Sequence, residues 1–107
     1  MEREELLKLI ESKEVIGVDL SGQKLEKIDF TGCRIERTSF KGCELVHCRF
    51  RNAKISWSDF RYAEIQHGTF EGAEVEFSDF YRAFIDGVVI FGGSSFYNCS
   101  LNKTYFG

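Results

Sequence analysis

The sequence predicts an all-β solenoid, a fold in which short units of chain wind into stacked coils. Three observations lead to this class. Large apolar residues recur at every fifth position, small residues precede most of them by two positions, and glycines follow several of them by two positions. The large positions run unbroken through Leu20, Leu25, Phe30, Ile35, Phe40, Leu45, Phe50, Ile55, Phe60, Ile65, Phe70, Val75, Phe80 and Ile85.

The period of five excludes a regular helix or strand as the repeating unit. Residues five apart point to opposite faces of a strand, and they lie about 140° apart on a helix. Neither element therefore buries them together. A chain that turns after each unit does bury them, because every unit becomes a short extended segment with two inward side chains followed by a corner. Glycine at several corners supplies the permissive dihedral angles: Gly22, Gly32, Gly42, Gly72 and Gly87.

Units such as SDFRYAEI and SDFYRAFI resemble the pentapeptide-repeat family, whose unit reads roughly A-(D/N)-(L/F)-x-x. The resemblance covers about residues 18–107. It implies a right-handed quadrilateral β-helix of about four to five coils, with four units in each coil and coils about 4.8 Å apart. Alternation of phenylalanine with aliphatic residues supports four walls independently, because it stacks Phe30, Phe50 and Phe70 on one wall and Phe40, Phe60 and Phe80 on the opposite wall.

The first residues predict a short helix that covers the first coil. Residues 2–13 place Leu6, Leu7 and Ile10 on one face with charged residues around them, and glutamates lie early, where the helix dipole favours them. Terminal coils of a solenoid need such a cap. We therefore divide the chain into an N-terminal capping helix, residues 1–15, and a pentapeptide-repeat β-helix domain, residues 16–107.

The repeat moves by one residue within the segment IDGVVIFGGSSF, where we expect a bulge or a widened corner near Gly87–Gly93. The large positions then continue to the end of the sequence without a second cap. Apolar side chains beside unpaired backbone groups invite another chain, so we expect either a homodimer through the C-terminal coil or a longer protein. The candidate dimer end comprises Phe91, Phe96, Leu101 and Phe106.

Charge and hydrophobicity exclude several classes of partner. The net charge is −3, with basic and acidic residues mixed, so there is no basic stripe for direct nucleic-acid binding. The start, MEREELLKLI, lacks the basic region of a secretory signal, and no segment approaches the roughly 18 apolar residues of a membrane span. We expect a cytoplasmic protein with no membrane contact.

No group of residues predicts catalysis, a metal site or a cofactor. Cys33, Cys43, Cys48 and Cys99 lack C-x-x-C spacing and are expected to be free thiols, with a disulfide between the neighbours Cys43 and Cys48 as the minor alternative. His47 and His67 would stack near Glu44 and Glu64, but a metal needs a third convergent ligand. The aspartates before large positions repeat along flat walls, whereas catalytic carboxylates converge in a concave site: Asp19, Asp29, Asp59 and Asp79. We predict that the protein is not an enzyme.

Exposed aromatic residues give the best candidate for a partner surface. Trp57 and Phe77 fall at outward corner positions, near Asp79. Two interpretations are open: the rings bind a protein partner, or they shield the coil edges, with Arg37 over Trp57 as a cation-π ladder. The candidate partner surface comprises Arg37, Trp57, Tyr62, Phe77, Tyr81, Arg82 and Tyr97.

These features favour a non-catalytic structural or protein-interaction module that binds a protein through a wall or through its open C-terminal coil. The alternative comes from the resemblance, which includes DNA-mimicking proteins that bind DNA gyrase and protect it from quinolones. Mimicry of DNA requires an extended acidic surface. Here residues 54–107 carry the acidic excess, whereas the earlier half is balanced.

Overall fold

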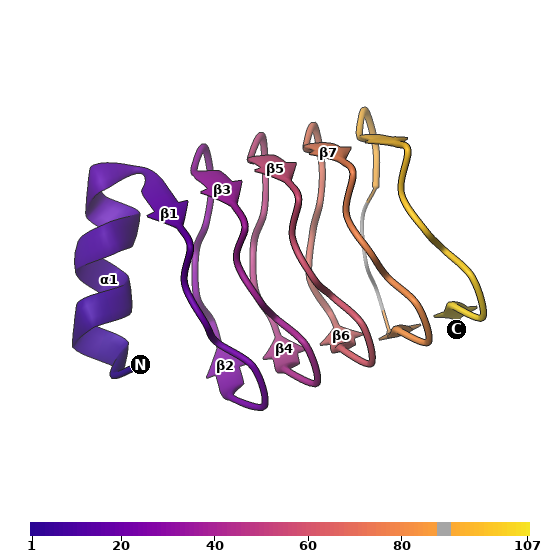
Figure 1. Cartoon of the computed structure of the whole chain (residues 1–107), viewed down its shortest axis with the longest axis horizontal. Helices are drawn as coiled ribbons and strands as arrows, with labels where there is room; N and C mark the ends of the chain where they lie inside the picture. Colours follow the sequence, from indigo (N-terminus) through magenta and orange to yellow (C-terminus); the bar gives the residue numbers. More distant parts are fainter. Residues whose placement is uncertain (88–90) are drawn as a thin grey trace.

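The computed structural model describes residues 1–87 and 91–107. Within these residues the chain forms one helix followed by short strands, and the predicted β-solenoid with an N-terminal helix is confirmed (Figure 1). The elements are α1 (Arg3–Ser12), β1 (Glu14–Ile16), β2 (Lys24–Glu26), β3 (Arg34–Glu36), β4 (Glu44–Val46), β5 (Lys54–Ser56), β6 (Glu64–Gln66), β7 (Glu74–Glu76), β8 (Phe84–Asp86), β9 (Ser95–Tyr97) and β10 (Tyr105–Phe106).

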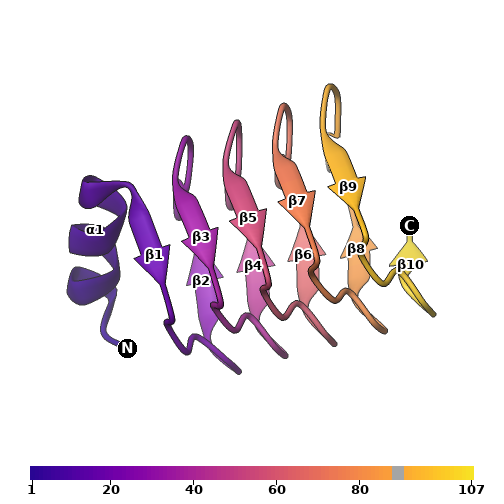
Figure 2. The same cartoon turned by 45° about the horizontal axis from the view of Figure 1, so that its top comes forward.

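Each coil of the solenoid has four sides, which we call walls A, B, C and D in the order in which the chain passes through them. Wall A is the parallel sheet β1-β3-β5-β7-β9, and wall C is the parallel sheet β10-β8-β6-β4-β2. Figures 1 and 2 show the successive coils side by side along the long axis, with wall A and wall C on different sides of each coil. Walls B and D have isolated parallel bridges in place of strands. Wall B pairs Asp19, Ser39, Asp59, Asp79 and Ser100, and wall D pairs Asp29, Arg49 and Thr69.

Stacked phenylalanines form the core, as the alternating pattern predicts. Neighbouring rings within one column lie nearly parallel, with centroids 4.8 Å apart for Phe30 and Phe50 and 4.6 Å apart for Phe40 and Phe60. Rings of facing columns meet edge to face, at 5.8 Å between Phe30 and Phe40. This geometry suits the ring quadrupole and fills the interior without exposed edges. All six rings from Phe30 to Phe80 are at most 1% exposed.

The corners adopt left-handed backbone conformations whether or not glycine occupies them. Gly22 and Gly42 have φ of 72° and 67°, as their place in the repeat predicts. Lys27, Trp57 and Tyr62 reach φ of 55°, 52° and 60° at equivalent corners, although a side chain there costs about 1–2 kcal/mol. The pairing of residues twenty positions apart in neighbouring coils therefore determines the corner conformation more strongly than the residue type does.

Helix α1 packs across the first coil and ends at Lys13, whose left-handed backbone donates a hydrogen bond to the Ile10 carbonyl at 2.9 Å. Leu6 is 1% exposed, and Leu9 and Ile10 pack against the core. Leu7, which the helical face was predicted to bury, is 43% exposed, and Leu9 takes its place against the core. No helix in the described part of the chain is long and apolar enough to cross a membrane.

The predicted shift of the repeat by one residue is confirmed by the strand register. Strand β6 pairs Ile65 with Ile85, twenty residues on, whereas β7 pairs Val75 with Phe96. The extra residue enters after Asp86, which still accepts a hydrogen bond from the His67 amide, and before Gly92, which accepts one from Gly72. The bulge predicted near Gly87–Gly93 falls partly on residues 88–90, which lie outside the described residues.

Candidate functional site

The predicted partner surface borders a single wall. Residues 57–62 cross wall B within one coil, so Trp57 and Tyr62 stand at its two edges, at most roughly 17 Å apart between Cα atoms. Phe77 and Arg82 repeat these two positions in the next coil. The candidate partner surface therefore divides into two groups, which lie on opposite borders of wall B.

The border between walls A and B is a ladder of aromatic rings, in which Trp57 and Tyr97 are exposed and Phe77 between them is partly buried. The Trp57 and Phe77 rings stack with centroids 4.7 Å apart and an interplanar angle of 10°, and Tyr97 meets Phe77 edge to face at 5.8 Å. Trp57 is 64% exposed and Tyr97 is 60% exposed. Arg37 precedes Trp57 in this column, but its guanidinium lies 3.7 Å from the Glu36 carboxylate. Among the described residues it makes no cation-π contact with Trp57, so the ladder of Arg37 over Trp57, which belonged to one of the two open interpretations, is not formed.

The border between walls B and C combines tyrosine with arginine. Tyr62 and Tyr81 meet edge to face, with centroids 5.9 Å apart. Arg82 donates a hydrogen bond from Nε to the Tyr81 hydroxyl at 3.0 Å, and its guanidinium carbon lies 5.5 Å from the Tyr81 ring centroid. The cation-π contact of this surface therefore forms here.

Between the borders, the carboxylates of wall B are occupied by nearby donors. Asp59 forms an ion pair with Arg61 at 2.7 Å and accepts a hydrogen bond from the Arg61 amide at 2.9 Å. Burial raises the pKa of Asp59, but the hydrogen bonds and charge of Arg61 outweigh burial and hold that pKa below its usual value. Asp79 accepts a hydrogen bond from the Tyr81 amide at 2.9 Å. The wall thus has apolar borders and a polar centre whose hydrogen bonds are made.

The four residues of the candidate dimer end surround one cavity of about 210 Å³, together with Phe80 and Ile85. Phe106 is 56% exposed and Leu101 is 43% exposed, whereas Phe91 and Phe96 are partly buried against the core. We call this set, Phe91, Phe96, Leu101 and Phe106, the C-terminal apolar cluster. The structure brings its members together at the last described coil.

A further aromatic pair, which was not predicted from the sequence, lies on wall C. Phe84 and Tyr105 stack with centroids 4.5 Å apart, and they are 40% and 52% exposed. Both occupy a position of the unit that holds charged residues in earlier coils, such as Glu44 and Glu64, so the change of residue type was visible in the sequence. Their contact was not, because it also depends on how the two side chains are oriented on neighbouring coils.

The cysteines and histidines lie in contrasting environments. The Cys43 and Cys48 sulfurs point inward and lie 2.9 Å and 3.2 Å from the Leu20 and Leu25 carbonyl oxygens, and burial raises the pKa of both thiols to about 11. All four cysteines are free. The imidazoles of His47 and His67 stack on the surface with centroids 5.3 Å apart. Within the described ranges, no group of three or more His, Cys, Asp or Glu side chains converges on a possible metal position.

Comparison with known proteins relates this geometry to one family. The sequence model for the pentapeptide repeat region matches residues 15–90. The crystal structure of a pentapeptide repeat protein from the thylakoid lumen of Arabidopsis thaliana shares 27% identity with a TM-score of 0.55, and covers 77% of this chain. The match covers 61% of that protein, so the chain spans less than two thirds of its length.

Two cyanobacterial structures are also similar. A pentapeptide repeat protein from Cyanothece has 12% identity and a TM-score of 0.42, over 95% of this chain and 97% of that one. One involved in the regulation of heterocyst differentiation in Nostoc has 14% identity and a TM-score of 0.42, over 86% of this chain and 56% of that one. No curated protein matches the sequence.

Proposed function

The chain belongs to the pentapeptide repeat family, and on this premise we propose that it is a non-catalytic interaction module that binds a protein partner through wall B. The observation that carries the proposal is the pair of exposed aromatic borders on one wall. Trp57, Phe77 and Tyr97 line one border, and Tyr62 and Tyr81 line the other.

This arrangement supports protein binding on three physical grounds. Tryptophan, tyrosine and arginine dominate the binding energy of protein interfaces, because they bury large areas while retaining a polar group. Stacked rings are already ordered, so little side-chain entropy remains to be lost on binding. Asp59 and Arg61 satisfy each other between the borders, so a partner that covers the wall leaves no isolated charge buried.

The same wall offers little to a chemical reaction. Its aspartates repeat along a flat surface and bond their own corners, as Asp19 does with the Ser21 amide at 2.9 Å. A general acid or base needs a neighbouring group in a concave site, where substrate is held and water excluded. We therefore propose a role without catalysis, which is general among members of this family.

The decisive experiment replaces the exposed rings without disturbing the coils. We expect Trp57→Ser with Phe77→Ser to abolish capture of the partner by the tagged protein in extracts of cells that express it. The matched control is Phe84→Ser with Tyr105→Ser, which removes the other exposed stacked pair from wall C. If the wall B variant still captures the partner at wild-type yield, wall B is not the binding surface. If both variants lose capture of the partner, the partner adheres non-specifically to exposed aromatic rings.

We also propose that the C-terminal apolar cluster mediates homodimerisation. Burial of Leu101 and Phe106 against a second copy would remove apolar surface from water, at about 25 cal/mol per Å². Strands β9 and β10 end their sheets at the same coil, so a second copy would also pair exposed backbone groups.

The alternative as a DNA mimic that binds gyrase has weaker support. Mimicry requires regular columns of negative charge, but the outward column of wall A reads Glu14, Arg34, Lys54, Glu74 and Ser95. Wall C has two adjacent glutamates, Glu44 and Glu64, before the column becomes aromatic. We expect gyrase supercoiling to be unchanged by excess protein, with and without a quinolone; inhibition or protection would favour the mimic.

A further inference from the structure

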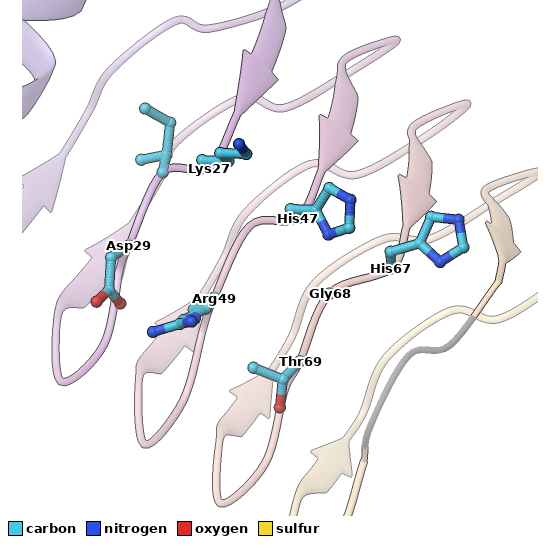
Figure 3. Close-up of a pocket in the computed structure, with 8 residues that line it drawn as sticks. Lys27, Asp29, His47, Arg49, His67, Gly68 and Thr69 are labelled. Carbon is cyan, nitrogen blue, oxygen red and sulfur yellow. The ribbon is translucent and has the colours of Figure 1, made fainter.

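Wall D carries an open groove that none of these functions uses. It has a volume of about 900 Å³, and its polar lining comes from three consecutive coils (Figure 3). Lys27 and Asp29 belong to the first coil, His47 and Arg49 to the second, and His67 and Thr69 to the third. The groove therefore follows the long axis of the solenoid.

The lining is rich in cationic and imidazole groups, although the whole chain has a net charge of −3. Both histidines of the chain lie here, beside Lys27 and Arg49. Asp29 is the one carboxylate among the lining residues, and it accepts hydrogen bonds from the Thr31 amide, at 3.0 Å, and from the Thr31 hydroxyl. Figure 3 shows its carboxylate pointing away from the two imidazoles, which lie side by side.

Arg49 differs from the other arginines of the chain. Four of the others have a carboxylate partner, Arg82 contacts Tyr81, and Arg3 donates to the Glu26 carbonyl. Within residues 1–87 and 91–107, the guanidinium of Arg49 makes no ion pair, hydrogen bond or ring contact, and Lys27 makes no ion pair. Arg49 faces Asp29 across the wall D bridge, and the pKa of Asp29 is held below its usual value chiefly by the Thr31 hydroxyl and to a smaller extent by the charge of Arg49. Within the described residues neither Arg49 nor Lys27 is held in an ion pair, so both cations can still engage a ligand.

Two glycines shape the groove near the histidines. A Cβ atom at Gly87 would lie 2.4 Å from Cε1 of His67, so glycine allows that ring to lie over the backbone of the following coil. A Cβ atom at Gly68 would lie 2.6 Å from the Cys48 carbonyl oxygen, so glycine also allows the second and third coils to approach. Glycine at these two positions therefore leaves room for the His67 ring and for the close approach of the coils.

We infer that this groove binds an acidic segment of another protein in an extended conformation. From Lys27 to His67 the lining spans two coil spacings, roughly 10 Å, which exceeds the reach of a single small anion. An extended peptide places alternate side chains on one face at intervals of roughly 7 Å, so two successive carboxylates match the length of the groove. The peptide is also narrow enough to avoid the glutamates Glu44 and Glu64 of wall C, which would repel the broad phosphate backbone of a nucleic acid.

The inference is tested with a fluorescein-labelled hexaglutamate peptide and fluorescence anisotropy at low salt. We expect the full chain to bind it, and Lys27→Gln with Arg49→Gln to weaken binding by about tenfold, as loss of two exposed charge pairs predicts. Lys54→Gln with Lys103→Gln removes the same charge outside the groove and should change affinity by less than about twofold. Circular dichroism melts establish that each variant is folded.

Several outcomes would overturn the inference. Wild-type protein that fails to bind the peptide at millimolar concentration would exclude an acidic peptide site, and equal weakening in both double variants would show that binding follows net charge. If tripolyphosphate binds more tightly than the peptide, the groove is a site for phosphate ligands. If a hexathymidylate binds more tightly than the peptide, the groove is a site for nucleic acid. Because wall D is separate from wall B, Trp57→Ser with Phe77→Ser should leave peptide binding unchanged, so this inference and the proposed function fail independently.

Discussion

The two ends of the solenoid differ although their repeats are alike. At the first coil, helix α1 covers the apolar interior, and Leu6 is 1% exposed (Figure 2). At the last described coil, Phe106 occupies the same kind of position as Phe50, yet Phe50 is fully buried and Phe106 is 56% exposed. The repeat therefore decides which side chains point inward, whereas the burial of a side chain depends on what covers its coil on either side.

The largest expected effect is on the stability of the middle coils. We expect Phe50→Ala to lower the free energy of unfolding by about 3–5 kcal/mol, because the ring stacks on both Phe30 and Phe70 and leaves a cavity when removed. Phe106→Ala should cost less than about 1 kcal/mol in the monomer, because the ring already faces solvent. Urea denaturation measures both, and equal losses would show that the last coil is as well packed as the middle ones.

A somewhat smaller effect is expected at the helical cap. Leu6→Ala should lower the free energy of unfolding by about 2–3 kcal/mol, since this side chain joins α1 to the core. Leu7→Ala is the matched control on the same helix and should cost less than about 0.5 kcal/mol, because Leu7 is 43% exposed. If both variants unfold at the same urea concentration, α1 does not act as a cap.

Measuring the oligomeric state tests whether the protein dimerises through the C-terminal apolar cluster. We expect sedimentation equilibrium to show dimers of the wild-type protein, and Phe106→Asp to weaken association by about tenfold or more, because a carboxylate would be buried in an apolar contact. Trp57→Asp places the same charge at another exposed ring, on wall B, and should leave association unchanged. A wild-type monomer at all concentrations would contradict dimerisation through the C-terminal apolar cluster.

The smallest expected effect concerns the stability that the Asp59 carboxylate contributes as pH falls. The pKa of Asp59 is held below its usual value, so its contribution is present above about pH 4, the ordinary pKa of an unfolded aspartate, and is lost as pH falls through the folded pKa. From about pH 5 to pH 2, we expect the wild type to lose more stability than Asp59→Asn, by less than about 1 kcal/mol. Arg61→Gln should likewise lose less stability than the wild type over this pH range, because the Asp59 carboxylate then lacks its ion-pair partner. If both variants lose as much stability as the wild type, this contribution of Asp59 is excluded.

The amino-acid pattern was sufficient to predict the solenoid, the columns of phenylalanine on two opposite walls and the shift of register near Gly87–Gly93. The period of five has one solution that buries Phe30, Phe40 and their equivalents together, so local periodicity was sufficient. The prediction that Leu7 faces the core was wrong: Leu7 is exposed, and Leu9 is partly buried in its place. The orientation of the helix on the first coil decides between them.

The contacts between outward side chains became clear from the folded structure and not from the repeat. The folded structure paired Arg37 with Glu36, placed Tyr62 and Trp57 on opposite borders of one wall, and placed Arg49 beside Asp29 in the groove of wall D. Inward positions follow from alternation along a short extended unit, which is a local property of the chain. Outward contacts depend on residues twenty or twenty-one positions away and on side-chain rotamers, so they are defined once the coils are stacked in register.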